Sequence, residues 1–327
     1  MKYDFDAVID RRNTRSYKWD QSEKLFGDKD IMPLWVADMD FESPPAVKEA
    51  MLRRLEQGVY GYSVSSEPYK EAITSWFKRR HDWSIQPQWI TDSPGIVTSL
   101  SLAVDLYSEP GSEVILQSPV YYPFYDVINM NGRKVAKNPL ILQNGRYEMD
   151  YDQLEGLMKG GAKLLLLCSP HNPGGRVWER EELLKLGELC LAYGVTVISD
   201  EIHCDMALPG HTHYPFAALS EELANITVTT LAATKTFNLP GLQTSFIVAS
   251  NPDLKRKFDM RLKTLSLHMA HYFAPEAVQA AYNEGEEWLD ELMIYISGNA
   301  EYAISYLSEH LPQIQVMQPQ ATYLLWL

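Results

Sequence analysis

Hydrophobic residues follow two patterns along the chain, and each pattern predicts one kind of secondary structure. Spacings of three and four residues predict helices that begin at Ser43-Pro44-Pro45 and after Glu67-Pro68. The same spacing predicts further helices over residues 95–107, 179–193, 252–267 and 287–309. Short apolar runs without polar alternation predict buried strands over residues 113–117, 163–168, 195–199 and 226–231. Two more strands are predicted over residues 314–317 and 322–327.

The order of these elements predicts an α/β fold. Strands and helices alternate from about residue 91 onward, which is typical of βαβ units that build a mainly parallel sheet covered by helices. Ligands of such sheets bind beyond the carboxyl ends of the strands. The residues that directly follow each buried strand are therefore the first candidates for a functional site.

Composition and charge restrict the kind of protein. Hydrophobic residues make up 46% of the 327 residues and charged residues 22%, which is typical of a soluble globular protein. The net charge of −14 repels phosphate backbones and anionic lipids, so we expect neither nucleic acid nor membrane as a partner. The charged N-terminus lacks the apolar core of a signal peptide, and no apolar run is long enough to span a membrane. We therefore predict a cytoplasmic protein.

The sequence shows no motif for metal binding, for nucleotide binding or for a serine hydrolase. The three cysteines have no paired spacing, so they predict neither a disulfide framework nor a CxxC metal site. His203, Cys204, Asp205, His211 and His213 are close in sequence, but their spacing fits no zinc pattern, and we expect no metal. The sequence also lacks a Walker loop, a GxGxxG motif after a strand and a GxSxG motif.

Three polar side chains follow three successive buried strands of the predicted sheet. They are Asn172, Asp200 and Lys235. A buried lysine can lose its proton and form a Schiff base with an aldehyde. An aspartate on the neighbouring strand can pair with a protonated ring nitrogen, and the two groups together suit pyridoxal 5′-phosphate.

The phosphate and the ring of this cofactor need further supports, and the sequence offers them. Gly95 opens a helix whose free N–H groups, at Ile96 and Val97, can bind a phosphate with the help of the helix dipole. Thr234 adds a hydroxyl group beside the lysine, and Tyr121 can lie over the ring. Each feature alone is more typical of a turn, a cap or a solvated loop. Their combination in this order predicts a cofactor site.

Seven motifs make the chain resemble a known family. It is similar to the fold-type I pyridoxal-phosphate enzymes of the aminotransferase superfamily, and within them to the MalY/PatB group of cystathionine β-lyases, also called C–S lyases. The resemblance covers the whole chain. The motifs are ADMDF (37–41), GVYGY (58–62), SPGIVTSL (93–100), CSPHNPGGRVW (168–178), VISDEIH (197–203), TKTFNLPGLQ (234–243) and WLDEL (288–292).

The resemblance implies roles for the residues around the cofactor ring. Lys235 and Tyr121 would be the catalytic residues, the lysine as the Schiff-base partner and the tyrosine stacked on the ring. Asp200 would pair with the ring nitrogen, and Asn172 would hydrogen-bond the phenolic oxygen. His203 stands where many aminotransferases have a tyrosine, and it can still donate to that oxygen.

The resemblance also implies how the phosphate is bound and that the protein is a homodimer. Ile96 and Val97, next to Gly95, match the backbone phosphate donors. Tyr62 matches a tyrosine that reaches the phosphate of the partner subunit, so complete sites require a homodimer. Gln243 stands where many aminotransferases carry a phosphate-binding arginine. The phosphate would then depend more on the helix terminus and the Thr234 hydroxyl.

The fold implied by the resemblance is the three-layer PLP-dependent transferase fold type I, with a mainly parallel sheet and a smaller α+β domain. Residues 1–45 would form an N-terminal arm and part of the small domain, 46–284 the large cofactor-binding domain, and 285–327 the start of the C-terminal small domain. Family members continue for several tens of residues beyond the position of Leu327. We expect that segment to complete the small domain and to carry the arginine that binds the substrate carboxylate.

The activity implied by the resemblance is a carbon–sulfur β-lyase. It would cleave cystathionine or a related cysteine thioether to a thiol, pyruvate and ammonia, and Ala37, Asp38 and Asn172 would contact the amino-acid substrate. Two alternatives stay open. An aminotransferase shares the steps through proton abstraction, and the side chains at the centre of the site do not separate it from a lyase. A regulatory or binding member of the family without catalytic activity is the second alternative.

Overall fold

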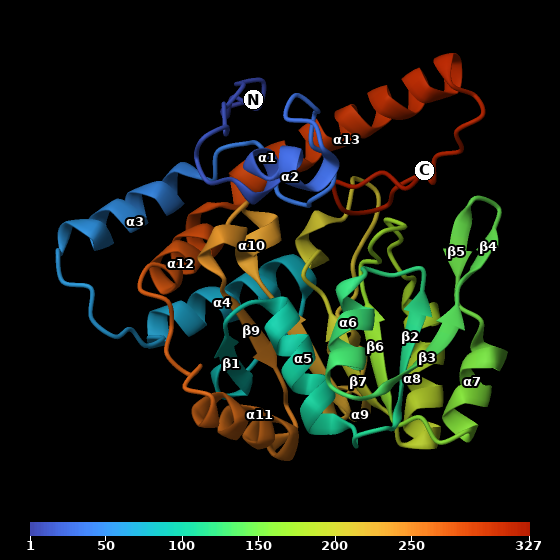
Figure 1. The fold of residues 1–327 in the computed structure, drawn as a ribbon. Helices are drawn as coiled ribbons and strands as arrows, with labels where there is room; N and C mark the ends of the chain where they lie inside the picture. The colour runs from blue at the N-terminus through green and yellow to red at the C-terminus, as the bar shows by residue number, and fades with distance from the viewer.

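A computed structural model describes residues 1–327, and Figure 1 shows its fold. The strands are β1 (Ile90–Ser93), β2 (Glu113–Ser118), β3 (Lys134–Pro139), β4 (Ile141–Gln143), β5 (Arg146–Glu148), β6 (Leu164–Cys168), β7 (Thr196–Asp200), β8 (Thr227–Leu231) and β9 (Ser245–Val248). The longer helices are α3 (Pro45–Glu56), α4 (Glu67–His81), α5 (Ile96–Tyr107), α6 (Pro123–Met130), α7 (Tyr151–Lys159), α8 (Arg180–Tyr193), α11 (Pro252–Thr264), α12 (Ala274–Glu284) and α13 (Glu286–His310). The short helices are α1 (Tyr17–Asp20), α2 (Ser22–Phe26), η1 (Pro87–Trp89), η2 (Cys204–Met206), η3 (Phe216–Ala218), α9 (Glu221–Asn225), α10 (Ala233–Thr236) and η4 (Pro240–Leu242). None of the helices combines the length and the apolar character that crossing a bilayer requires.

Seven strands form one sheet in the order β1-β9-β8-β7-β6-β2-β3. Strands β8, β7, β6, β2 and β3 are parallel to their neighbours in this series, whereas β9 is antiparallel to both β8 and β1. Because β9 is antiparallel to both of its neighbours, β1 runs in the same direction as β8 and the other parallel strands. Six strands therefore end at the same edge of the sheet, and this is the edge where an α/β fold binds its ligands.

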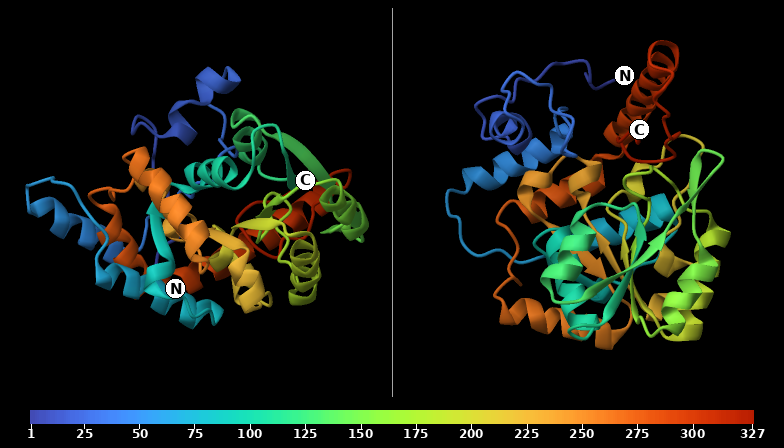
Figure 2. Two further views of the ribbon diagram at one scale, coloured as in Figure 1. Left: turned by 90° about the horizontal axis from the view of Figure 1, so that it is seen from below. Right: turned by 45° about the vertical axis from the view of Figure 1, so that its right-hand side comes forward.

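Helices cover the sheet on both faces (Figure 2), so the parallel strands are buried from two sides. Leu164 and Leu166 of β6 pack into one core with α5, α6 and α11, and Leu165 and Leu167 pack into a second core with α7 and α8. All five residues of β6 are buried. A fully buried leucine contributes about 1.5–3 kcal/mol. These two cores therefore hold the strand ends firmly in place.

A third core joins the N-terminal segment to α4, α12 and the first half of α13. Trp76 and Trp288 are fully buried in it, and the ring of Phe5 contacts Trp288 with centroids 5.8 Å apart. The N-terminal segment and α13 thereby lie above the carboxyl edge of the sheet (Figures 1 and 2). The two ends of the chain are thus placed over the strand ends that carry the candidate chemistry.

The structure confirms the predicted α/β class and the predicted elements in the middle of the chain. The strands predicted over 163–168, 195–199 and 226–231 are β6, β7 and β8, each shifted by one residue at most. The predicted apolar face of α4 is buried, and Gly194 ends α8 with a left-handed φ of 61°. The division of the chain into three domains stays a prediction.

Two strands predicted at the end of the chain were wrong. Residues 314–317 and 322–327 are not strands, and this region contributes only an isolated bridge between Ala207 and Ala321. Thr322 has a φ of 73°, which an extended strand does not allow, and Pro319 has no N–H to donate. The free N–H groups instead bond to loops, from Ala321 to the Gly175 carbonyl and from Thr322 to the Met206 carbonyl.

Smaller corrections concern helix ends. Ser43 does not cap α3, because its hydroxyl donates to the Asn238 carbonyl at 3.1 Å and the helix begins behind Pro44 without a side-chain cap. Helix α11 ends at Thr264 and not at residue 267. The sequence patterns also did not predict β1, β3, β9 or the β4–β5 hairpin, all of which are at most six residues long.

Candidate active site

The carboxyl ends of β6, β7 and β8 place the three predicted polar residues at one edge. Asp200 is the last residue of β7 and is paired in register with Cys168, the last residue of β6. Lys235 lies on the short helix α10, which begins two residues after the end of β8. Asn172 lies in the loop behind β6. The backbone therefore places these three residues at one edge of the sheet, as the sequence predicts.

Asp200 is a buried carboxyl group with a perturbed pKa. Its exposed fraction is 3%. Burial, supported by the negative charge of Glu201, raises its pKa to about 7, although the backbone N–H of Ile202 at 3.2 Å and the charge of Lys235 act in the opposite direction. Such an acid binds a cationic partner strongly, because pairing removes the cost of its buried charge.

Lys235 is a largely buried amine beside two acids. Burial lowers its pKa, while the charges of Asp38 and Asp200 raise it in part. Its Nζ donates a hydrogen bond to the carbonyl of Ala37. A lysine in this setting can deprotonate and react with a carbonyl group far more readily than a solvated one.

The loops behind β2 and β6 are tied to each other. Tyr121 donates its backbone N–H to the Asn172 carbonyl at 3.0 Å, and the His171 ring hydrogen-bonds the Pro119 carbonyl at 2.9 Å. The Asn172 N–H donates in turn to the Cys168 sulfur at 3.3 Å. Burial raises the pKa of Tyr121 to about 12, with a contribution from the charge of Asp200. The predicted ring-stacking tyrosine and the predicted phenolate partner thus stand next to each other.

The start of helix α5 provides an anion site at the same edge. Gly95 precedes the helix with a φ of 90°, a conformation that favours glycine, and no side chain caps the helix. The first N–H groups of the helix, including those of Ile96 and Val97, have no acceptor within the helix and carry its positive end. Gln243 lies against this turn, because its Oε1 is 3.6 Å from the position that a Gly95 Cβ would take.

His203 and Tyr323 close the site from the side of the C-terminal segment. His203 is buried, burial lowers its pKa to about 3, and its Nδ1 has no hydrogen-bond partner. The ring of Tyr323 meets His203 edge-on at 6.1 Å, and its hydroxyl donates to the Ala37 carbonyl at 3.1 Å. The sequence analysis missed Tyr323, since nothing in the local pattern connects it to a residue 286 positions earlier.

The segment that contains Ala37 is held by charged side chains from the N-terminal arm. Arg11 binds the carboxylate of Asp38 through both of its terminal nitrogens, at 2.8 and 2.9 Å. Lys18 donates to the Asp38 carbonyl at 3.1 Å and also binds Asp40. The predicted substrate residue Asp38 therefore already has a protein partner for its carboxylate.

Asn238, three residues after Lys235, binds the segment that contains Ala37. The sequence patterns did not predict this role either. Its side chain accepts from the Met39 N–H at 3.1 Å and donates to the carbonyls of Met39 and Phe41 at 2.9 and 2.8 Å. The φ of Asn238 is 55°, which asparagine tolerates better than most residues. An asparagine three residues after the candidate lysine is the only local sequence signal that could have identified it.

Two predicted site residues differ in where they lie. Thr234 is buried next to Lys235, as expected. Tyr62 is 93% exposed and makes no hydrogen bond within the chain. The structure thus brings all predicted ring and phosphate residues to the carboxyl edge except Tyr62.

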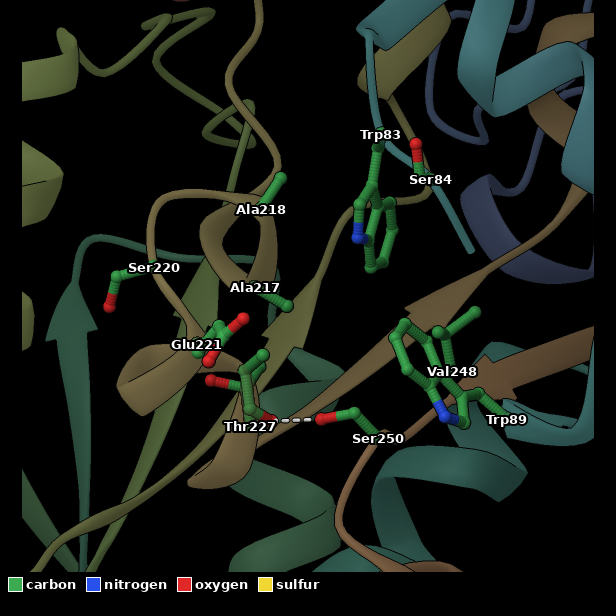
Figure 3. A pocket seen from close by; sticks show the side chains of 11 residues that line it. Trp83, Ser84, Trp89, Ala217, Ala218, Ser220, Glu221, Thr227, Val248 and Ser250 are labelled. Carbon is green, nitrogen blue, oxygen red and sulfur yellow. Dashed lines mark hydrogen bonds between the residues drawn. The ribbon is translucent and has the colours of Figure 1, made fainter. Parts of the chain in front are cut away.

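One cavity of the molecule lies away from this site. A cavity of about 290 Å³ lies at the opposite end of the sheet, near the start of β8 at Thr227 and the end of β9 at Val248 (Figure 3). Trp83 and Trp89 form its apolar walls, and the Ser250 hydroxyl at its rim donates to the Ala224 carbonyl at 3.0 Å. None of the predicted site residues lines it.

The residues at the carboxyl edge fit pyridoxal 5′-phosphate. The orphaned Nδ1 of His203 is a polar atom that needs a partner, and the uncapped start of α5 offers N–H donors to an anion. The buried Asp200 and Lys235 supply an acid and an amine with perturbed pKa values. These are the three kinds of support that this cofactor requires.

Comparisons with known proteins agree with the geometry. The sequence model of the aminotransferase class I and II family matches residues 29–327. Cystathionine beta-lyase PatB of Bacillus subtilis is 48% identical over 99% of this chain and 84% of its own length, and protein MalY of Escherichia coli is 35% identical over 99% and 83%. The crystal structure of the PLP-bound C-S lyase from Staphylococcus hominis, 34% identical, superimposes with a TM-score of 0.93 over 99% of this chain and 82% of that chain.

Proposed function

Since this chain belongs to the aminotransferase class I and II family, we propose that it is a pyridoxal-phosphate-dependent carbon–sulfur β-lyase that acts on cysteine thioethers such as cystathionine. The observation that carries the proposal is the buried amine of Lys235 beside the buried acid Asp200 at the strand ends, in a chain 48% identical to a cystathionine beta-lyase. The expected resemblance to the fold-type I pyridoxal-phosphate enzymes and to the MalY/PatB group is confirmed.

Each part of the cofactor has a residue to hold it. Lys235 would bind the aldehyde, Asp200 would pair with the ring nitrogen, and Asn172 together with His203 would hydrogen-bond the phenolic oxygen. Tyr121 would cover the ring, and the N–H groups at the start of α5 and the Thr234 hydroxyl would bind the phosphate. When bound, the cofactor withdraws electrons from the substrate's Cα, which makes the Cα proton removable.

Lys235 is the proton carrier of the reaction. Its Nζ takes the proton from the substrate's Cα, and the thiolate then leaves from Cβ. Burial lowers the pKa of this amine, which makes its unprotonated form easier to reach than that of a solvated lysine. The Ala37 carbonyl, which accepts from Nζ, holds the amine on the side of the site where the N-terminal arm lies.

The substrate's side chain has room on that same side. A cavity of about 280 Å³ lies beside Asp38 and Tyr323 and has apolar walls from Met39, Phe41 and Leu324. A thioether is an apolar, polarizable group that suits such a wall. We assign the backbone of Ala37 and the side chain of Asn172 to substrate contacts, and we assign Asp38 mainly to the support of this segment through Arg11.

Production of pyruvate without any keto acid tests the proposal. Purified protein loaded with pyridoxal phosphate and given L-cystathionine as the only other substrate should release pyruvate and free thiol continuously, over many turnovers. The measurement is a coupled lactate dehydrogenase assay together with a thiol reagent. An aminotransferase would stop after one turnover per site and resume only when a keto acid is added. Protein that binds no cofactor and shows no visible absorbance would instead indicate a binding or regulatory member.

The exposed segment around Tyr62 supports a homodimer with shared sites. Val59, Tyr60, Tyr62 and Val64 are 60–93% exposed, which is unusual for a run of apolar residues on a free surface. In a homodimer this segment is covered, and Tyr62 can reach the phosphate of the partner's cofactor.

Mixing two inactive variants should therefore restore activity. Lys235→Ala and Tyr62→Ala each damage every site of their own dimer. In a mixed dimer, one site carries both changes and the other carries none. We expect each variant alone to be strongly impaired and an exchanged mixture to recover up to about a quarter of wild-type turnover, as random pairing into dimers predicts. Sedimentation velocity should show a dimer in all samples, and a monomer or an inactive mixture would contradict shared sites.

A further inference from the structure

A buried carboxylate hydrogen-bonds the residue next to the reactive lysine. Asp205, on η2, accepts hydrogen bonds from Trp76 Nε1 at 2.9 Å and from the Thr236 hydroxyl at 2.9 Å, and it hydrogen-bonds His81 Nε2 at 2.8 Å. Its side chain is 1% exposed. Trp76 and His81 come from α4, and Thr236 from α10. One carboxylate therefore joins three separate parts of the chain.

The contact with Thr236 matters because this residue follows Lys235 directly. Helix α10 has only four residues and no side-chain cap at its start. A helix of this length is not stable by itself, so its position depends on contacts with its surroundings. Thr236 is fully buried, and its hydroxyl donates to Asp205. The hydrogen bond thus fixes the backbone that carries the lysine.

The neighbouring aromatic residues reinforce this fastening. Trp76 donates to Asp205 and also packs edge-on against Phe237, the residue after Thr236, with centroids 5.5 Å apart. Phe237 is fully buried and contacts Tyr282 of α12 at 5.9 Å. The two residues after Lys235 are therefore held by the Asp205 carboxylate, which binds Thr236, and by Trp76 of α4, which packs against Phe237.

The ionisation of Asp205 agrees with a purely internal role. Burial by itself raises the pKa of this carboxyl group, but the hydrogen bonds from His81, Trp76 and Thr236 outweigh burial and hold the pKa below its ordinary value. His81, Cys204 and Asp205 present possible metal-ligand atoms within 4.8 Å of one another. The two oxygens of Asp205 already have three protein partners, however, so the carboxylate is satisfied without an ion.

We propose that Asp205 is a positioning residue that, through the Thr236 hydroxyl, sets the place of the Lys235 amine at the cofactor and at the substrate's Cα. This inference rests on the proposed role of Lys235. Asp205 touches neither cofactor nor substrate, and it acts by holding α10. A displacement of about 1 Å at a reacting group can cost about 100-fold in rate. A single buried hydrogen bond is therefore enough to influence both cofactor capture and turnover.

The test uses Thr236→Val, which keeps the shape of the side chain and removes only the hydroxyl donor. Cofactor-free protein is mixed with pyridoxal phosphate, and the rate at which Lys235 acquires a borohydride-stable label is followed by mass spectrometry. We expect the labelling rate and kcat to fall about 10- to 100-fold, with a smaller change in KM. Thr236→Ser, which retains the donor, should restore both.

The matched control is Thr227→Val at the opposite end of β8. Thr227 is equally buried, and its hydroxyl donates to the Leu223 carbonyl at 2.6 Å. This variant loses one buried hydrogen bond of the same kind and should lower the melting temperature to a similar degree. Its labelling rate and kcat should equal those of the wild type. If the two valine variants are alike in labelling rate and kcat, the positioning role is refuted.

A double substitution separates positioning from general damage. If Asp205 acts through Thr236, the pair Asp205→Asn and Thr236→Val should label no more slowly than Asp205→Asn alone. Additive losses would show that the two residues act independently and would overturn the inference. Failure of the proposed role of Lys235 looks different, because wild-type protein would then acquire no label on Lys235 at all. Failure of the lyase activity alone would leave the label and would appear only in the pyruvate assay.

Discussion

Replacing Lys235 by alanine is expected to abolish turnover of a cysteine thioether and the visible absorbance of the cofactor-loaded protein. The methyl group of alanine cannot form a bond with the aldehyde and cannot carry the Cα proton. Loss of a positioned general base alone costs about 10²–10⁴-fold. Loss of covalent cofactor attachment adds to this, so we expect turnover below 0.01% of wild type, which is roughly 10⁴-fold. Pyruvate release checks the loss of turnover, and the visible absorbance of the cofactor-loaded protein checks the loss of the Schiff base.

The alanine variant should fold normally, and this keeps the result interpretable. Burial disfavours the charged form of this amine, as its lowered pKa indicates. We therefore do not expect its removal to lower the free energy of unfolding. Lys263→Ala on the exposed side of α11 is the matched control and should retain full activity. Circular dichroism should be unchanged for both variants. Substantial turnover by Lys235→Ala would refute the assignment of the reactive amine.

The position of the site could be predicted from the sequence because it depends on a regular feature. Uninterrupted apolar runs identify β6, β7 and β8 as buried strands, and strands of one parallel sheet end at one edge. Asn172, Asp200 and Lys235 each follow such a run, so their proximity needs no knowledge of the rest of the fold. The helix start at Gly95 is visible for a similar reason, since glycine before an apolar periodic segment marks a helix terminus.

Contacts between distant segments could not be predicted in this way. Tyr323 and Lys235 both bond to the carbonyl of Ala37, at sequence separations of 286 and 198 residues. The Asp205 carboxylate meets Trp76 across 129 residues. No periodicity connects such pairs, because the fold of the N-terminal and C-terminal segments over the sheet brings them together. The resemblance to a family identified Ala37, but it gave no partner for its carbonyl.

The error at the C-terminus has the same origin. The apolar letters of residues 322–327 resemble a strand, yet a strand needs a neighbour that offers a row of free backbone groups. In the structure, the N–H groups of Ala321 and Thr322 bond instead to single carbonyls of two separate loops, at Gly175 and Met206. The segment therefore has no regular secondary structure, and this irregular path brings Tyr323 to the site.

Replacing Asp200 by asparagine is expected to remove most activity while it stabilises the cofactor-free protein at alkaline pH. The amide keeps the shape of the carboxylate but offers no negative charge to the ring nitrogen. Breaking a buried charge pair costs about 3–5 kcal/mol, which corresponds to a loss of about 10²–10³-fold or more in cofactor affinity or rate. Cofactor titration and steady-state pyruvate release check this loss. Ser245→Ala, a buried polar change on β9, is a control that should retain cofactor binding.

The stability effect follows from the direction of the pKa shift. The folded state raises the pKa of Asp200 from 3.8 to about 7, so it binds the proton more tightly than the unfolded chain does. The stability that this group contributes is therefore fully present below about pH 4 and is lost as the pH rises toward 7. Asparagine does not titrate. The unfolding free energy of Asp200→Asn relative to wild type should thus increase between pH 4 and pH 8, by up to about 4 kcal/mol for a shift of this size.

Urea denaturation of both cofactor-free proteins at pH 5 and pH 8 measures this difference. His203, whose pKa burial lowers to about 3, changes stability in the opposite direction with pH, but it is present in both proteins and cancels. A stability difference that is the same at both pH values would contradict the buried, proton-binding state of Asp200. The expected result is a stability difference that rises with pH, together with lost cofactor binding. It would show that the charge of Asp200 destabilises the cofactor-free protein, and that pairing with the cofactor's ring nitrogen stabilises this charge.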